Sequence, residues 1–501
     1  MENPENKKLS PEIKGNGSLL SILKLVFGLL ILISAGSFWK FGSYLSPDSL
    51  SYARLSEGFP YLLSSLSPFY PFLLSQPPLS LIPLIDRILV LNVLVFGGAF
   101  WMLVKIAGKT GEYFSLIFYT FGISLLSWGS FRVIGSAHAD SLFYLLLLVW
   151  LYLFVWGNKG ENYYLPAIAS LSALLIWVKL NALFLIPFLL IWSRIEPKKG
   201  WLLVAGSTLL SWLIYQWAIP DNILSYHLMG SRSPTASGLD AVPLFFENFA
   251  TWMQVTLGLV VSDTLSQYIP KMLAFVLGIA WLAFLVLFLI GHKNKSGNKR
   301  YALLLFGTIY SLFFLGFQQW SGFREVNYRT LFPYLLVVSW SLWLFLLRIK
   351  RPKMLLLVAL LVAGHTLVGH LLLWQREDVA SLAEARSFHH SNLKKYILNL
   401  LDGRRIEIRT DYPEKLMLSY RDNEVIRLDP AFAFINGKNE PLDPNKMLEE
   451  RQESLNSLMQ GTAVIVLFRP TPFWKQVAEN PSVQHLIEGE TLILYSERLP
   501  K

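Results

Sequence analysis

Residues 41–76 read FGSYLSPDSLSYARLSEGFPYLLSSLSPFYPFLLSQ, and the rest of the chain is organised around them. The first half of this stretch is polar and carries Asp48, Tyr52, Arg54 and Glu57, whereas the second half is aromatic and rich in proline. The stretch follows a first apolar run of the length that crosses a bilayer, but it is too interrupted to be a span itself. This pattern predicts a loop that lies at a membrane surface and presents a carboxylate there.

The composition is that of a polytopic membrane protein. Of the 501 residues, 53% are hydrophobic, 14% aromatic and only 16% charged, with a mean hydropathy of +0.43, which is too apolar for a soluble chain of this length. The net charge of +10 does not indicate nucleic acid, because the Lys and Arg residues lie mainly between the apolar segments. The absence of cysteine excludes disulfides, thiolate metal sites and cysteine nucleophiles.

Apolar runs predict eleven spans. The first is too long for the apolar region of a cleavable signal peptide, so we expect it to stay as a span. Lys179 and Asn181 interrupt the fifth and sixth runs, which predicts two helices meeting at a polar turn; one kinked helix with a re-entrant end is the alternative. The runs lie near residues 19–39, 84–104, 112–128, 140–156, 163–178, 181–193, 201–219, 272–291, 301–318, 330–347 and 354–374.

The basic residues predict the orientation. Lys and Arg gather before the first run and after the second, fourth, sixth, eighth and tenth, which places six segments on one side of the membrane. That side should be cytoplasmic. We therefore expect a cytoplasmic tail at 1–18, a transmembrane domain at 19–374 with a first extracytoplasmic loop at 40–80, and an extracytoplasmic segment at 375–501.

The opposite side carries fewer charges. Any one of them is more simply an interfacial residue that ends a helix. As a set on one face, with acidic residues in two loops and basic residues in three, they predict a site. The loops concerned hold Asp48 and Glu57; Arg132, His138 and Asp140; Lys179 and Asn181; residues 220–271; and Arg324, Glu325 and Arg329.

The chain beyond residue 375 has the composition of a soluble protein. Helical patterns at 379–401, 412–420, 444–459 and 471–480 alternate with the strand-like stretches IEIRT, EVIRL, AVIVLF and TLILY. This order predicts a small α/β domain with a largely parallel sheet. The segment has no glycine-rich phosphate loop, zinc spacing or nucleophile elbow, so a lid, acceptor-recognition or structural role is expected.

Four motifs resemble those of the GT-C class of membrane glycosyltransferases, within it the bacterial protein O-mannosyltransferase and lipid A aminoarabinose transferase group. The resemblance covers residues 19–375, and the order and spacing of the motifs carry it. The motifs are PDSLSYARLSEG with SPFYPFLLS after the first span, AHADSLFYLLLLVWLYLF at the fourth, WVKLNALFLIPFLLIW, and YRTLFPYLLVV.

The resemblance implies an inverting sugar transfer from a polyprenyl-phosphate-linked donor to an extracytoplasmic protein, lipid or glycan, in the bacterial cytoplasmic (inner) membrane. Asp48 matches the catalytic Asp of the family, which takes the acceptor's proton as the acceptor attacks the anomeric carbon. An N-cap is the alternative role for Asp48. Arg329 matches an Arg common in the family, and Arg324, Lys179 and Arg132 are further candidates for binding the phosphate, a stable anion that needs positive donors.

Asp140 matches a Glu or Asp that relatives carry where the fourth span begins. It would orient the sugar or, with Asp48 and His138, hold a divalent metal cation, the one cofactor that this set suggests. His138, Tyr52 and Glu57 are further candidates for positioning the sugar or the acceptor, and for His138 an ordinary interfacial role is the alternative to metal ligation. Relatives often have two adjacent acidic residues in the first loop, whereas this chain has only Asp48 before Glu57.

The aromatic run Phe59, Tyr61, Phe69, Tyr70 and Phe72 predicts a surface helix at the headgroup level, where a lipid donor would lie. Packing between the loop and neighbouring spans is the alternative. Two other function classes stay open: a secondary transporter, which predicts repeated halves with interrupted helices, and a noncatalytic membrane scaffold or assembly factor that works through the C-terminal domain.

Overall fold

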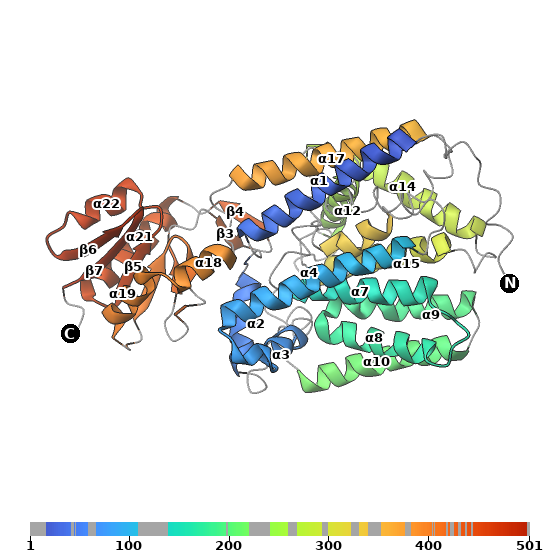
Figure 1. The fold of residues 1–501 in the computed structure, drawn as a ribbon, viewed down its shortest axis with the longest axis horizontal. Helices are drawn as coiled ribbons and strands as arrows, with labels where there is room; N and C mark the ends of the chain where they lie inside the picture. The colour runs from blue at the N-terminus through green and yellow to red at the C-terminus, as the bar shows by residue number, and fades with distance from the viewer. Residues whose placement is uncertain are drawn as a thin grey trace.

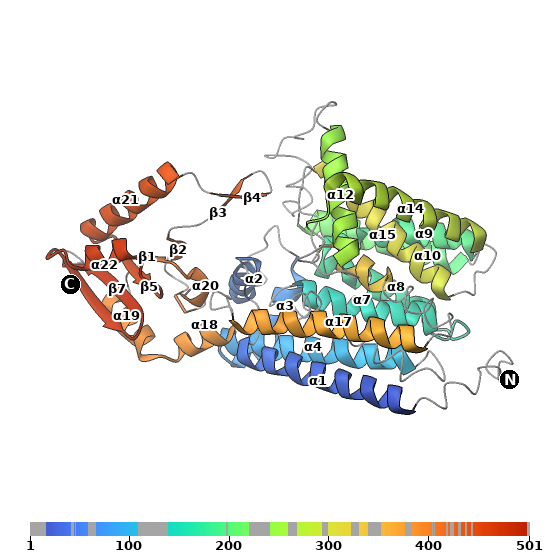
Figure 2. The same cartoon turned by 90° about the horizontal axis from the view of Figure 1, so that it is seen from above.

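A computed structural model describes residues 17–41, 45, 47–58, 67–108, 139–196, 199–219, 241–258, 268–292, 299–321, 330–338, 352–375, 382–402, 404, 406–416, 419–420, 425–428, 432–435, 438–441 and 444–497. A bundle of apolar helices forms the larger part, and a mixed sheet with its helices forms the smaller (Figures 1 and 2). The bundle contains α1 (Gly17–Phe41), α2 (Pro47–Gly58), α3 (Phe69–Ser75), η3 (Leu79–Leu81), α4 (Leu84–Gly108), α7 (Ala139–Trp156), α8 (Tyr164–Val178), η4 (Leu180–Phe184), α9 (Leu185–Ile195), α10 (Lys199–Ala218), α12 (Ala241–Gly258), α14 (Lys271–His292), α15 (Lys299–Ser321), a helix at 330–338, and α17 (Pro352–Gln375).

Helices occupy the expected spans wherever the chain is described. The run at 112–128 lies outside the described residues, and the run at 330–347 is described only to residue 338. By length and composition, three of the described helices are long and apolar enough to cross a membrane, at Leu84–Met102, Ala139–Trp156 and Lys271–Gly291. Many large apolar side chains of the first and third of these helices are exposed, as expected of surfaces that face lipid, whereas no residue of Ala139–Trp156 is exposed.

The segment at 163–193 is a helical hairpin. The backbone of Lys179 is extended (φ −160°, ψ 125°), and a 3₁₀ helix follows before α9 begins. Lys159, which precedes α8, lies 2.8 Å from Glu196, which follows α9, so the chain returns to the end from which α8 started. Of the two alternatives that the sequence left open, the structure has two helices meeting at a polar turn.

Helix α12 lies within the segment 220–271, where no helix was expected. It packs against α14 and α15. Glu247, Asn248 and Gln254 lower its hydropathy and hide it from a search for apolar runs, yet Asn248 and Gln254 are buried. The Gln254 side chain donates to the carbonyl of Ile269 at 2.6 Å, and Glu247 pairs with Lys271 at 2.8 Å.

Helices α1 and α17 lie side by side in both views and are joined by polar contacts (Figures 1 and 2). The buried imidazole of His370 contacts the hydroxyls of Ser34 at 3.3 Å and Ser37 at 2.9 Å. The Trp374 indole donates to Ser37 at 2.7 Å, and Lys40 donates to the Trp374 carbonyl at 2.9 Å. The first and last described helices of the bundle are thus joined at one end.

Tyr70 does not lie at the headgroup level. Its side chain is fully buried, its hydroxyl donates to Asn92 of α4 at 3.2 Å, and its ring packs edge-on against Tyr52 of α2 at 5.5 Å. For Tyr70 the surface-helix interpretation is therefore wrong, because the polar end of the ring finds its partner inside the bundle. Phe59 and Tyr61 lie outside the described residues.

The C-terminal sheet has the strand order β2-β1-β5-β7-β6. Strands β2, β1 and β5 pair in parallel, and β7 pairs antiparallel with both β5 and β6. Four of the five strands therefore point the same way, as the expectation of a largely parallel sheet requires, and β7 alone runs in the opposite direction. A tight turn at Gly489, which has φ 61°, makes β6 and β7 a hairpin. The elements are α18 (Leu382–His389), α19 (Asn392–Leu401), β1 (Glu407–Thr410), α20 (Pro413–Leu416), β2 (Val425–Arg427), α21 (Pro444–Gln460), β5 (Ala463–Leu467), α22 (Pro472–Ala478), β6 (Val483–Glu488) and β7 (Thr491–Ser496), with β3 (Phe432–Ile435) and β4 (Lys438–Pro441) as a separate hairpin.

Helix α18 belongs to both cores. Its buried residues Leu382 and Ala385 pack in the core of the helix bundle, whereas Phe388 packs in the core under the sheet. Arg386 pairs with Asp86 at the start of α4 at 2.7 Å. In the described part of the chain, α18 thus joins the sheet to the bundle (Figure 1).

Candidate functional site

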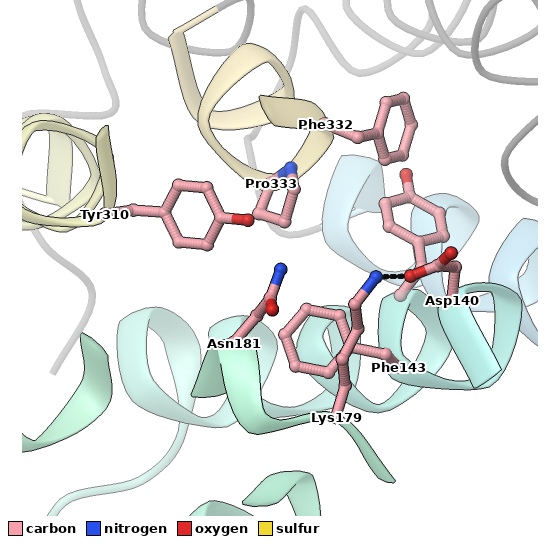
Figure 3. Close-up of a pocket in the computed structure, with 8 residues that line it drawn as sticks. Asp140, Phe143, Lys179, Asn181, Tyr310, Phe332 and Pro333 are labelled. Carbon is pink, nitrogen blue, oxygen red and sulfur yellow. Dashed lines mark ion pairs between the residues drawn. The ribbon is translucent and has the colours of Figure 1, made fainter. Parts of the chain in front are cut away.

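A pocket lies where α7, the α8–α9 turn, α15 and the helix at 330–338 meet (Figure 3). It encloses about 250 Å³ of empty space, including its open mouth. One wall is charged and the other is aromatic and hydroxylic. The lining residues are Asp140, Phe143, Tyr144, Lys179, Asn181, Tyr310, Phe332 and Pro333.

Asp140 is the acidic residue of the first turn of α7. This position suits a carboxylate, because the unpaired backbone N–H groups at a helix N-terminus favour negative charge. Its side chain is only 5% exposed, and a buried carboxylate is costly unless it is paired. The start of α7 therefore places a negative charge in the pocket, and the burial of that charge requires a cation close to it.

Lys179 supplies that cation. Its extended backbone at the end of α8 directs the ammonium at the Asp140 carboxylate, and the two form an ion pair (Figure 3). The Lys179 side chain is 20% exposed, so the pair is mostly removed from solvent but reachable from the pocket. A charge-balanced pair of this kind can exchange the carboxylate for another anion.

The facing wall is formed by Tyr310 of α15 and by the start of the helix at 330–338. The Tyr310 hydroxyl donates to the carbonyl of Thr330 at 2.6 Å. The ring of Phe332 packs against Tyr144 with centroids 4.6 Å apart, which joins this wall to α7. Asn181 lies between Lys179 and Tyr310 (Figure 3).

The structure brings together Asp140 and Lys179, which the sequence singled out for different roles. Asp48 is the second residue of α2, so it lies within the first turn of that helix. The structure describes its backbone and not its side chain. Tyr52 is buried against Tyr70, and Glu57 is exposed on α2; neither lines this pocket. Arg132, His138, Arg324 and Arg329 lie outside the described residues.

Sequence reasoning missed the uncharged lining residues. Phe143, Tyr310, Phe332 and Pro333 are ordinary members of apolar helices, and nothing in their spacing separates pocket from core. Asn181 had a usable signal, because a polar amide two residues after a lysine in an apolar run needs partners.

The described part of the pocket offers a divalent cation a single carboxylate, and that carboxylate is already paired with an ammonium. The side chains of Asp48 and His138, the other two residues of the expected metal set, lie outside the described part of the chain. Among the described residues there is also no group of three His, Asp or Glu side chains arranged to hold a metal ion.

Two solved structures are similar to this chain at low identity. ArnT from Cupriavidus metallidurans in the apo state is 12% identical, with a TM-score of 0.36 over 95% of this chain and 97% of that one. ArnT from the same organism bound to undecaprenyl phosphate is 13% identical, with a TM-score of 0.38 over 96% and 99%. No protein-family model and no curated protein matches the sequence. At these TM-scores, function has to be argued from the residues of the chain.

Proposed function

We propose that the protein is an inverting glycosyltransferase that moves a sugar from a polyprenyl-phosphate-linked donor to an extracytoplasmic acceptor. The observation that carries this proposal is the mostly buried Asp140–Lys179 ion pair that lines a partly aromatic pocket. The motifs around both residues are among those that resemble the GT-C class.

The chemistry needs a base and a cation. The acceptor hydroxyl attacks the anomeric carbon, the bond from that carbon to the phosphate oxygen breaks, and its electron pair leaves on the phosphate. Asp48 takes the proton of the acceptor hydroxyl. The leaving phosphate is already a stable anion, so Lys179 and Arg329 stabilise it by charge-assisted hydrogen bonds without donating a proton.

Asp140 has one role before the substrate binds and another afterwards. Without substrate it neutralises the mostly buried ammonium of Lys179. When a phosphate reaches Lys179, the Asp140 carboxylate is released to accept hydrogen bonds from sugar hydroxyls. The rings of Phe143 and Phe332 supply an apolar surface for the C–H face of the sugar.

The position of the pocket supports an extracytoplasmic reaction. The Asp140–Lys179 pair and the Lys159–Glu196 pair lie at opposite ends of α8. A 15-residue helix is roughly 22 Å long. Since the basic loop with Lys159 is the end predicted to be cytoplasmic, the pocket would open at the other surface, where a lipid-linked donor and an external acceptor meet.

The test is donor cleavage by the purified protein in lipid vesicles, measured as release of polyprenyl phosphate. Asp48→Asn should lower the rate by about 10²–10⁴-fold, the usual contribution of a general base. Glu161→Gln is the matched control, because it removes a carboxylate at the opposite end of α8 and should keep full activity.

Full activity in Asp48→Asn would overturn the assignment of the base. A folded wild-type protein that cleaves no polyprenyl-phosphate sugar would favour the scaffold role instead.

A further inference from the structure

We infer that His389, Lys394 and Ser419 form a binding site for a terminal phosphate group, either free or as a monoester. The inference goes beyond the proposed sugar transfer and does not depend on it, because none of the three residues lines the Asp140–Lys179 pocket. The three side chains come from separate elements. His389 ends α18, Lys394 is the third residue of α19, and Ser419 follows α20.

Backbone contacts hold these elements beside one another. The Ser391 hydroxyl caps α19 by accepting a hydrogen bond from the backbone N–H of Lys394 at 3.3 Å. The Tyr420 hydroxyl donates to the carbonyl of Lys394 at 3.1 Å, and the buried Tyr420 ring packs edge-on against Phe388 with centroids 6.0 Å apart. Ser419, the neighbour of Tyr420, is therefore held against the turn between α18 and α19.

The cluster has more hydrogen-bond donors than acceptors. The Nδ1 atom of His389 lies 3.1 Å from the Ser419 hydroxyl and 3.1 Å from the Lys394 ammonium, and its Nε2 atom lies 3.3 Å from the same ammonium. A neutral imidazole has one acceptor nitrogen in either tautomer. If that nitrogen is Nδ1, the hydroxyl and the ammonium compete for it. If it is Nε2, the ammonium takes it and the hydroxyl proton of Ser419 is left over. In both cases a donor remains for a ligand.

Lys394 also differs from neighbouring cations in its charge balance. Arg386 pairs with Asp86 at 2.7 Å, and Lys415 pairs with Glu384 at 3.1 Å. Among the residues that the structure describes, no carboxylate lies within ion-pair distance of Lys394, although its side chain is partly buried. A partly buried cation whose described partners are an imidazole and a helix cap favours the binding of an anion.

A terminal phosphate matches this set in charge and in acceptor atoms. As a monoester it carries about −1.5 to −2 charges at pH 7 and three strong acceptor oxygens. The Lys394 ammonium and a protonated His389 would supply two positive charges, and the Ser419 hydroxyl would supply a further donor. A carboxylate, with a single charge and two oxygens, would satisfy only part of the cluster.

The protonation of His389 should accompany the binding. Burial, with Lys394 and His390 nearby, lowers the pKa of His389, and the charge of Asp86 acts in the opposite direction. The ring is therefore mostly neutral near pH 7 without a ligand. A bound dianion would favour the charged ring, so the site should take up a proton as it binds phosphate.

The site lies near one end of the helix bundle. Helices α18 and α20 lie between the sheet and the bundle, and α18 packs against α4 (Figure 2). The charge pattern of the sequence predicts that the end at which α4 begins is extracytoplasmic. Two sources of a terminal phosphate meet there: inorganic phosphate in solution and the phosphate headgroup of a lipid in the outer leaflet.

The experiment measures how fast an amine-specific acetylating reagent modifies Lys394 and Lys395 in the full-length protein, followed by mass spectrometry of the peptides. Lys395 is the adjacent, exposed lysine on the same helix and is the internal control. The protein is compared in phosphatidylcholine nanodiscs, in the same nanodiscs with inorganic phosphate, and in nanodiscs that also contain phosphatidic acid, whose headgroup is a phosphate monoester. A saturating ligand should slow the modification of Lys394 by about tenfold and that of Lys395 by less than about twofold.

The two arms distinguish the source. Protection by inorganic phosphate identifies a soluble ligand, and protection by phosphatidic acid alone identifies a lipid headgroup. Ser419→Ala should raise the Kd of the protecting ligand by about tenfold with little change in melting temperature. Asp48→Asn should keep the protection, since the site is independent of sugar transfer. No protection in either arm, equal protection of Lys395, or an unchanged Kd in Ser419→Ala would overturn the inference and leave the proposed function standing.

Sulfate tests the part played by His389, because its charge does not change near neutral pH. The Kd for sulfate, taken from the protection of Lys394, should be lower at about pH 6 than at about pH 8, because the charged ring favours the anion. His389→Gln should remove this difference, and His390→Gln should keep it. The same pH dependence in His389→Gln as in the wild type would show that His389 is not part of the site, which would also overturn the inference.

Discussion

Replacing Lys179 by methionine should destabilise the protein far more than replacing a similar lysine at the other end of the same helix. Methionine keeps the length and much of the apolar stem but removes the ammonium. The carboxylate of Asp140, whose side chain is only 5% exposed, then loses its ion-pair partner.

The size of the effect follows from that burial. Removing one partner of a buried ion pair costs about 3–5 kcal/mol. Because the pocket admits some water, we expect about 2–4 kcal/mol for Lys179→Met. Asp140→Asn combined with Lys179→Met should recover most of it.

The assay is unfolding of the purified protein in mild detergent, followed by tryptophan fluorescence. Lys159→Met is the control, because its ion pair with Glu196 has side chains 35% and 14% exposed and should contribute at most about 1 kcal/mol. Equal losses for Lys179→Met and Lys159→Met, or a double variant as unstable as the single one, would refute the reasoning.

Three further predictions concern the C-terminal part. Arg409→Met should lower the free energy of unfolding by about 1–3 kcal/mol, because it leaves the partners of a buried guanidinium without their hydrogen bonds. As a control, Lys475→Met at an exposed position should change the free energy of unfolding by no more than about 0.5 kcal/mol. Burial, with Lys394 and His390 nearby, lowers the pKa of His389 in the folded protein, so the unfolded chain binds the proton more readily. The melting temperature should therefore fall as the pH drops below 6.5, and it should fall less steeply in His389→Gln. Arg386→Ala should break the contact with Asp86 and speed limited proteolysis between the bundle and the sheet; an unchanged cleavage rate would show that the ion pair does not secure this junction.

The helices of the bundle could largely be predicted from the sequence because of one physical constraint. A backbone in hydrocarbon must satisfy its own hydrogen bonds, so long apolar runs become helices. Helix α12 escaped this reasoning because Asn248 and Gln254 make it too polar, although the fold buries them. Strand β6 was not predicted because it lies at the edge of the sheet. Most of its side chains are exposed, so its sequence shows little alternation of hydrophobic and polar residues.

Of the residues that line the pocket, only the charged ones could be predicted from the sequence. Asp140 and Lys179 stood out because ionisable residues at the ends of apolar runs are costly. Their pairing with each other did not follow from the sequence, since it depends on α7 and α8 packing side by side with the start of one at the end of the other. Tyr310 and Phe332 look like core residues until the packing brings them to the pocket.

The most direct test of the account is a mass-spectrometric screen of polyprenyl-phosphate sugars with the wild-type protein in vesicles. With the wild-type protein, at least one donor should lose its sugar and yield polyprenyl phosphate, and Asp48→Asn and Lys179→Met, each shown to be folded, should yield much less. Undiminished release by both variants, or no release from any donor by a folded wild-type protein, would contradict it.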